Sequence, residues 1–152
     1  MTSKEFVLET LKRSGKIAAQ SVQSKAAEMT GTELYAEDYY IPEFSEAVKK
    51  KNMLDRPIGF VCKSSAGRVV KLIQNYDSDI YTAEPEDLPA QFGFVWSKDP
   101  AKALPFIALS TSPYMTDECC TENDIVYKSK IDGNVYSPTE HPDGWAVITD
   151  DN

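Results

Sequence analysis

The chain has 152 residues, 41% of them hydrophobic, and its 16 Lys and Arg face 24 Asp and Glu, which gives a formal charge of −8 at pH 7. Such a length accommodates one ordinary domain, or a helical segment followed by one or two very small modules. The negative charge argues against a nucleic-acid-binding protein and against adsorption to an anionic membrane, because both need basic residues that face phosphates.

The charge is unevenly distributed along the chain. Residues 1–56 carry nine Lys and Arg and nine Asp and Glu, whereas residues 57–152 carry seven against fifteen and so hold the whole net charge. This asymmetry indicates a neutral docking or scaffold element followed by an acidic module that is displayed. The simpler interpretation is that the acidic residues form an ordinary solvated surface.

The first predicted element is a long helix over residues 3–29. Thr2 and Glu5 form a capping-box pattern, apolar residues then recur at steps of three and four, and Gly31 is expected to end the helix. Its apolar stripe is rich in alanine and therefore thin. Such a stripe suits packing on its own domain as well as bundling with copies of itself or with a partner. A short second helix is expected at residues 43–51, after a tyrosine-rich segment.

From Arg56 onward, short apolar stretches alternate with Pro, Gly and Asp, which is typical of strands joined by turns. Two blocks show the same order of strand, turn, strand, polar loop, Tyr, Pro and a strand with Trp. This order predicts a degenerate tandem repeat of a small β unit, although unrelated β-hairpins also produce it. The strands are expected at Ile58–Lys63, Arg68–Gln74 and Phe92–Trp96 in the first block, and at Glu118–Thr121, Ile125–Lys130 and Trp145–Ile148 in the second.

The sequence thus predicts an α+β fold in which an N-terminal helix precedes two small antiparallel β units. We expect a helical docking or oligomerisation region at residues 1–56, a first β unit at 57–112 and a second at 113–152. Units below about 40 residues usually need a disulfide, a metal or association to be stable. These units are therefore expected to lean on each other, on the N-terminal segment or on neighbouring subunits.

The cysteines offer little stabilisation of that kind. No signal-peptide block precedes the domain and no apolar stretch reaches the roughly 18–20 residues of a membrane-spanning helix, so we expect a reducing environment and no membrane insertion. Cys62, Cys119 and Cys120 are then expected to be free thiols in strands or in the core. The single His141 does not complete a zinc site with them, so neither a metal nor a cofactor is expected.

The most specific pattern in the chain lies in the second block. Tyr114 precedes the segment VYKS at 126–129, which is followed by DGNVYSP at 132–138 and by PDGW at 142–145. Residues 113–148 thereby resemble the chitin-binding type-3 pattern of carbohydrate-binding module families 5 and 12. The resemblance is strongest to the versions found on structural proteins of bacteriophages.

A weaker echo of this pattern covers residues 57–97, and the first third of the chain has no counterpart in it. The chain departs from the pattern at residues 117–118, which are Asp-Glu where the family usually has Gly-Asp. It departs again at Tyr136, where Trp is common. The resemblance implies a non-catalytic module that binds a sugar chain.

Such a module works through aromatic planes, because sugar rings present C–H faces to Tyr and Trp while nearby polar side chains bind the hydroxyl groups. The same residue types have a structural interpretation. In a small fold Trp and Tyr form the core, and Asp-Gly-Asn forms turns. The candidate stacking residues are Tyr127, Tyr136 and Trp145, with Asp132 and Asn134 as polar partners and with Tyr81 and Trp96 as their counterparts in the first block.

An enzyme is not expected. A nucleophilic triad would depend on His141 in a loop next to proline, and the chain has neither a Gly-rich phosphate loop nor a metal-spaced cluster. The resemblance favours a structural or decoration protein of a bacteriophage virion, in a head fiber, neck or tail, whose β units project outward.

Two other functions remain open on the sequence: a purely architectural subunit that binds no glycan, and an acidic intracellular regulator or inhibitor that mimics a polyanion. The expected partners are further copies of the chain in a homo-oligomer, other virion proteins, and bacterial or mucus polysaccharide, but not nucleic acid. The expected location is the virion, after assembly in the bacterial cytoplasm, and otherwise the cytoplasm itself.

Overall fold

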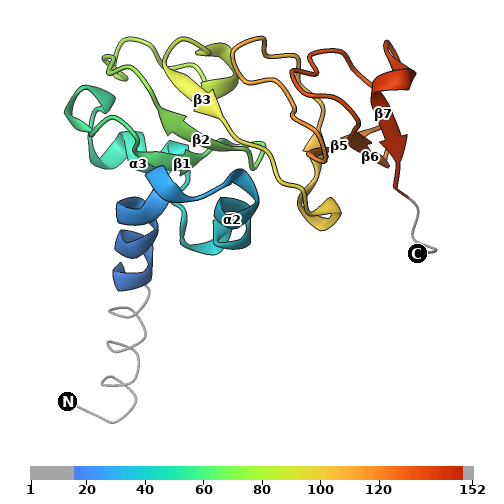
Figure 1. The fold of residues 1–152 in the computed structure, drawn as a ribbon. Coiled ribbons are helices and arrows are strands. Elements are labelled where there is room, and N and C mark those ends of the chain that lie inside the picture. Colours follow the sequence, from blue (N-terminus) through green and yellow to red (C-terminus); the bar gives the residue numbers. More distant parts are fainter. Residues whose placement is uncertain (1–15, 149–152) are drawn as a thin grey trace.

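The computed structural model describes residues 16–148, in which a helical N-terminal part precedes two β-sheets (Figure 1). Residues 16–25 are α-helical and continue into the 3-10 turn η1 (Ala26–Glu28). Two short α-helices follow, and 3-10 turns occur throughout the chain. These segments are α2 (Gly31–Ala36), η2 (Asp38–Tyr40), α3 (Phe44–Lys50), η3 (Met53–Asp55), η4 (Pro85–Asp87), η5 (Pro100–Lys102) and η6 (Pro142–Gly144).

The two sheets follow each other along the chain. The first has three antiparallel strands in the order β1-β2-β3; the second has four in the order β4-β5-β6-β7, with β4 parallel to β5 and the other pairs antiparallel. This mixed content agrees with the α+β class expected from the sequence. The strands are β1 (Val61–Lys63), β2 (Val69–Leu72), β3 (Phe92–Phe94), β4 (Leu104–Pro105), β5 (Cys119–Glu122), β6 (Ile125–Ser129) and β7 (Trp145–Val147).

The predicted strands and the helix expected at residues 43–51 are present, and most of them are shorter than predicted. In β1 the reason is local: Gly59 has a φ of +95°, a conformation outside strand geometry, so the regular strand register starts at Val61 although the Gly59 N–H still donates to the Leu72 carbonyl at 2.7 Å. Strand β4 was not predicted, because its two residues are identified as a strand only by their pairing with Cys120 and Thr121.

The prediction that Gly31 ends the first helix is wrong. The chain is already extended at Met29, and Gly31 is the first residue of α2. A capping box starts this helix: the Glu33 backbone N–H donates to Thr30 Oγ1 at 3.1 Å, and the Thr30 N–H donates to Glu33 Oε1 at 3.0 Å. The Thr2–Glu5 pattern and the beginning of the predicted helix lie outside the described residues.

The described part of the first helix packs on the first sheet of its own chain, which was one of the alternatives left open by its alanine-rich stripe. Val22 and Ala26 are buried there in one cluster with Val61 of β1. The Gln23 side chain forms two hydrogen bonds with the backbone of Val61, of 2.7 and 3.0 Å. These bonds continue the ladder past β1 and cover the edge of the sheet.

A tyrosine hydroxyl from α2 completes the pairing between the central strand and β3. Tyr35 Oη accepts a hydrogen bond from the Val69 N–H at 3.1 Å and donates one to the Val95 carbonyl at 2.9 Å. Because burial raises the pKa of Tyr35 to about 12, the hydroxyl stays protonated and can donate. The hydroxyl thus stands where a direct strand-to-strand bond is missing.

Replacing Tyr35 by phenylalanine is expected to lower the free energy of unfolding by about 1–3 kcal/mol, because the fully buried Val69 N–H loses its acceptor. Urea unfolding followed by circular dichroism measures the change. Tyr39→Phe is the matched control, since that ring is 87% exposed. An equal response of the two variants would contradict this role of Tyr35.

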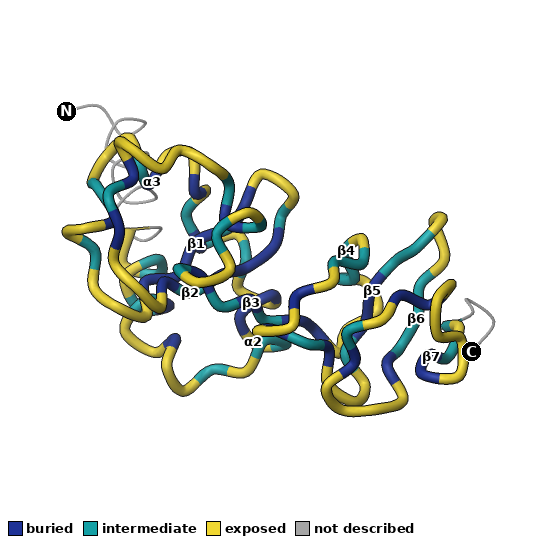
Figure 2. Tube along the Cα trace, turned by 90° about the horizontal axis from the view of Figure 1, so that it is seen from above, coloured by how far each residue is buried: buried dark blue, intermediate teal, exposed yellow. Residues whose placement is uncertain are grey.

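One hydrophobic core serves both sheets, and buried residues occur in the strands of each (Figure 2). At its centre Tyr114 is stacked between the rings of Trp96, at 4.4 Å between centroids, and Phe106, at 5.4 Å. Trp145 meets the edge of Tyr114 at 5.4 Å, and Phe94 stacks on Trp96. The aromatic residues of the two sequence blocks therefore stabilise each other.

Candidate functional site

The turn before β7 is organised by Asn134, one of the predicted polar partners for a sugar. The residue is 1% exposed, and its side-chain Nδ2 donates to Ser129 Oγ and to the Gly144 carbonyl, both at 3.1 Å. Its backbone pairs with that of Tyr114 in both directions. The amide is therefore used within the fold, and the structure does not present it to a ligand.

Trp145, a predicted stacking residue, is likewise internal. It begins β7 opposite Ser129, is 5% exposed, and belongs to the common core. Its indole Nε1 donates to the Tyr136 carbonyl at 2.9 Å. Trp145 thus holds the backbone that carries the neighbouring tyrosine, and its ring faces are occupied by protein.

Tyr136 is the aromatic residue that this arrangement exposes. The residue is 57% exposed, while its backbone is held on both sides: the N–H donates to Asn134 Oδ1 at 3.4 Å and the carbonyl accepts from Trp145. The His141 ring lies 6.1 Å away, inclined by 62°. The combination gives an accessible ring on a fixed main chain.

The loop that follows Tyr136 is fixed by its own hydrogen bonds. Ser137 accepts two of them: its carbonyl binds the His141 N–H at 2.9 Å, and its Oγ binds the Glu140 N–H at 3.1 Å. Thr139 donates to the carboxylate of Glu122 at the end of β5. The loop is thereby tied to the second sheet.

Asp132 is exposed and has a structural partner. Its Oδ1 accepts from the Thr116 N–H at 2.9 Å, and this backbone bond, followed by a bond to the Thr116 side chain, lowers the pKa of the carboxyl group. Asp132 is therefore ionised near neutral pH and can accept further hydrogen bonds from solvent or from a ligand.

Tyr127 lies on the core-facing side of the second sheet. It stands opposite Cys120 and Val147, and it is partly buried against the common core. Because Trp145 projects from this same face, the two predicted stacking residues of the sheet both point inward.

The first block contributes one internal and one exposed aromatic residue. Trp96 is 3% exposed, and its Nε1 donates to the Ser112 carbonyl at 2.9 Å. Tyr81 is 59% exposed and lies in the loop between β2 and β3. That loop and the one between β6 and β7 are separated along the long axis of the molecule (Figure 1). The structure therefore does not join Tyr81 and Tyr136 in one site.

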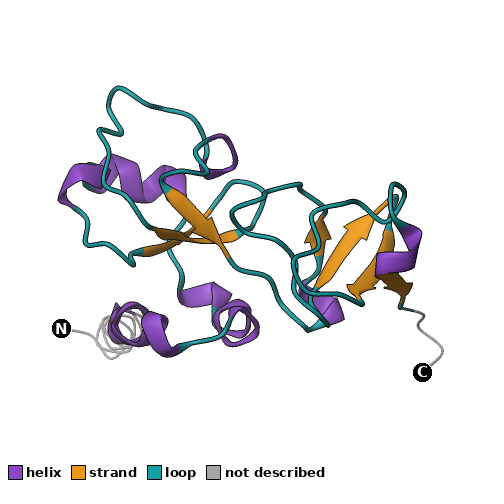
Figure 3. Cartoon of the chain, turned by 45° about the horizontal axis from the view of Figure 1, so that its top comes forward, coloured by secondary structure: helices purple, strands orange, loops and turns teal. Residues whose placement is uncertain are grey.

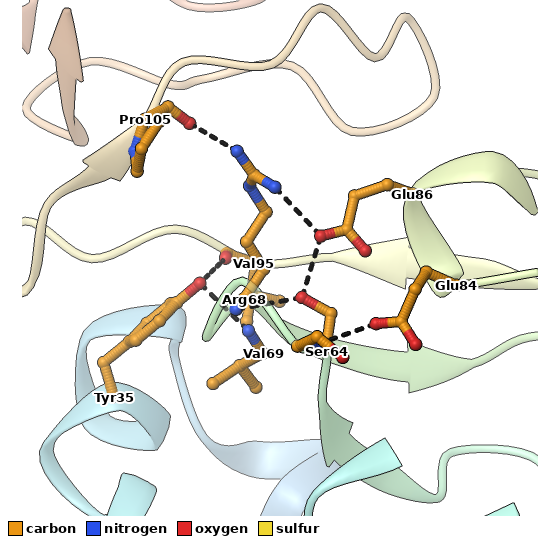
Figure 4. Close-up of polar contacts among 9 residues, drawn as sticks. Tyr35, Ser64, Arg68, Val69, Glu84, Glu86, Val95 and Pro105 are labelled. Carbon is orange, nitrogen blue, oxygen red and sulfur yellow. Dashed lines mark hydrogen bonds and ion pairs between the residues drawn. The ribbon is translucent and has the colours of Figure 1, made fainter. Parts of the chain in front are cut away.

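Arg68 forms a buried ion pair within the first unit and a hydrogen bond to the second sheet, and the sequence analysis did not predict either contact (Figure 4). Arg68 Nη1 lies 2.9 Å from Glu86 Oε2, and Nη2 donates to the Pro105 carbonyl in β4 at 2.7 Å. Ser64 Oγ donates to the same Glu86 oxygen at 2.8 Å. Arg68 stands at the start of an apolar stretch, which marks it in the sequence as a charge that needs a partner. The sequence does not indicate that this partner is Glu86, 18 residues away. The Arg68 guanidinium, oriented by Glu86, holds the hairpin of the first sheet against β4.

The three cysteines are free and buried, as expected from the sequence. Cys62 lies in β1, and Cys119 and Cys120 lie in β5. Burial raises the pKa of Cys62 and of Cys120 to about 12, which keeps both in the unreactive thiol form.

Residues 16–148 contain neither a grouped set of metal ligands nor a membrane-spanning helix. Within this range no three His, Cys, Asp or Glu side chains are grouped so that they could hold a metal ion. In the same range no helix combines the length and the apolar character needed to span a bilayer.

The molecule is thus an α+β protein with two sheets on one core, in which Tyr81 and Tyr136 are exposed on loops of different sheets. Comparison with models of protein families, with curated proteins and with solved structures found no match to the chain. The residues and their geometry are therefore the basis for a proposed function.

Proposed function

We propose that this chain is a non-enzymatic structural or decoration protein of a bacteriophage particle, whose second β unit binds a surface glycan through Tyr136. The particle is assembled in the bacterial cytoplasm, and the glycan is a bacterial or mucus polysaccharide. The N-terminal region docks the protein to other virion proteins or to copies of itself. The acidic β units are displayed.

The observation that carries this proposal is the exposed ring of Tyr136 on an anchored backbone. A sugar gains most from an aromatic plane that is already fixed, because binding then costs little conformational entropy. Trp145 fixes the Tyr136 carbonyl from inside the fold, and Asp132 offers an ionised acceptor on the same turn. The Asn134 amide of the same turn is engaged within the protein.

The overall arrangement also suits display. The helix at residues 16–25 lies on one side of the first sheet. The long loops between β2 and β3 and between β6 and β7 lie on the opposite side of the molecule (Figures 1 and 3). A particle bound through the helical side would therefore leave both loops accessible.

A purely architectural subunit is the second candidate, and one observation favours it. At the margin of the inward face of the second sheet, Ile125 and Val147 are exposed beside the partly buried Tyr127. Exposed apolar side chains that adjoin each other are typical of surfaces that pack against another subunit.

We also propose that the two antiparallel units descend from one repeated sequence. Both are meanders of the same order, and Lys71 of β2 opposes Gly93 as Lys128 of β6 opposes Ala146. This register places Trp145 in the position of Phe92. The sequence alignment, which paired Trp145 with Trp96, differs from it.

Tyr136→Ala is expected to weaken binding to insoluble chitin or peptidoglycan about tenfold, which corresponds to roughly 1.4 kcal/mol. Tyr136→Phe is expected to retain binding, because the ring plane is kept. Pull-down isotherms with the full chain measure both variants. Since the ring is largely exposed and its structural bonds are made by the backbone, both are expected to fold.

Tyr39→Ala, which removes another exposed tyrosine, is the control and is expected to bind like the wild type. Failure of the wild-type chain to bind either polysaccharide would reject the glycan proposal and leave the architectural function. In that case Ile125→Lys is expected to reduce the oligomeric mass measured by sedimentation.

A further inference from the structure

The loop between β2 and β3 encloses a pocket that no part of the proposed function uses. Its volume is about 450 Å³, within the range of about 300–1,000 Å³ that is typical of small-molecule sites. Tyr81 is one of its lining residues, and the pocket belongs to the first unit, apart from the Tyr136 loop of the second sheet. The residues that line the pocket are Gln74, Asn75, Tyr76, Asp77, Tyr81, Leu88 and Gln91.

The lining combines an aromatic plane with neutral hydrogen-bonding groups. Tyr81 offers an exposed ring, and Leu88 adds apolar surface. The side-chain amides of Gln74 and Gln91 make no hydrogen bond to other described residues, so donors and acceptors of both are free for a ligand. This combination suits a molecule with apolar ring faces and several hydroxyl groups.

Asp77 supplies a fixed acceptor at the wall. Its Oδ1 accepts from Asn52 Nδ2 at 2.9 Å and from the Asp79 N–H at 3.0 Å. These bonds, that of Asn52 first, lower the pKa of the carboxyl group, so Asp77 is ionised near neutral pH. The neighbouring Ser78 is buried and accepts from the Met53 N–H at 3.0 Å, which ties the loop to η3.

Tyr76, which also lines the pocket, is held in the hydrophobic core. Tyr76 is 7% exposed and meets the Phe92 ring edge-on at 5.7 Å. Its hydroxyl has no hydrogen-bond partner among the described residues. The pocket is therefore preformed on the hydrophobic core, with little reorganisation needed when a ligand enters.

The charge of the lining selects the ligand class. The described residues around the pocket include a carboxylate and no Lys, Arg or His, within a chain of net charge −8. An anionic ligand would be repelled, and a purely apolar one would leave the amides unpaired. A neutral saccharide meets both conditions.

We propose that the pocket lined by Tyr81 is a saccharide-binding site in its own right, with Tyr81 stacking on the sugar ring and Gln74, Asp77 and Gln91 binding its hydroxyl groups. The chain then has two sugar sites on separate sheets. A polysaccharide that reaches both binds with avidity, because the second contact is intramolecular.

The test is nuclear magnetic resonance titration of the isotope-labelled full chain with chitopentaose and with cellopentaose. The side-chain NH₂ signals of Gln74 and Gln91 are expected to shift, with a dissociation constant that Tyr81→Ala and Gln91→Ala each raise about tenfold. Tyr39→Ala is expected to leave this constant unchanged. Each variant's remaining backbone spectrum reports whether it is folded.

The same titration separates this inference from the proposed function. Shifts confined to Gln74 and Gln91 support the Tyr81 pocket and reject the Tyr136 site, and shifts confined to the loop between β6 and β7 do the reverse. Absence of shifts at Gln74 and Gln91 with both pentasaccharides overturns the pocket proposal. A dissociation constant that does not change in Tyr81→Ala or in Gln91→Ala also overturns it.

Discussion

Replacing Arg68 by methionine is expected to lower the free energy of unfolding by roughly 3–5 kcal/mol. The side chains of Arg68 and Glu86 are only 10% and 14% exposed. Removal of the cation therefore leaves the buried Glu86 carboxylate without its charged partner. The Pro105 carbonyl also loses its donor, so the contact between the first sheet and β4 is weakened. Urea unfolding of the full chain measures the loss.

Two further variants test whether burial is the cause. The double variant Arg68→Met/Glu86→Leu is expected to be more stable than Arg68→Met alone, because no uncompensated charge remains. Lys49→Met removes the cation of an exposed pair with Glu46 and is expected to change stability by less than about 0.5 kcal/mol. A loss for Arg68→Met as small as that for Lys49→Met would show that the Arg68 pair is solvated.

Gly31→Ala is expected to destabilise the protein by roughly 1–3 kcal/mol, which is typical of an overpacked contact. A Cβ at this position overlaps the backbone carbonyl oxygen of Trp96 and lies 3.0 Å from its backbone nitrogen. Neither atom belongs to a flexible side chain, so α2 or the Trp96 segment has to move. The Trp96 ring stacks on Tyr114, and such a shift therefore reaches the shared core.

The matched control is Gly93→Ala in β3, where the nearest atom is Ile73 Cγ2 at an ordinary 3.5 Å. This variant is expected to be as stable as the wild type or more stable, because alanine loses less entropy on folding than glycine. Thermal unfolding compares the two. Equal melting temperatures would refute the close approach of α2 to Trp96.

Local sequence patterns were sufficient for most of the fold. Alternation and turn residues located the strands from Val61 onward, and the apolar spacing at residues 43–51 located α3. The start of a helix at Gly31 also has a local signal, because the Thr30 and Glu33 spacing is that of a capping box. Strand β4 had no such signal, since its identity depends on pairing with β5.

The candidate site was only partly accessible to the same reasoning. The sequence identified the turn that carries Asp132, Asn134 and Tyr136, and the structure shows how that turn is held. The sequence did not reveal the pocket near Gln74 and Gln91, because the residues that form the pocket are brought together by the return of the chain from β2 to β3.

The sequence by itself determined the order of elements, the acidic character of the β units and the positions of their aromatic residues, because these follow from composition and local periodicity. Only the tertiary structure decided which aromatic residues face the solvent. Tyr114 inserts between Trp96 and Phe106 and thereby joins the two sheets on one core. Trp145 is buried against Tyr114, and Tyr136 remains exposed, because burial is set by contacts between segments that are distant in the chain.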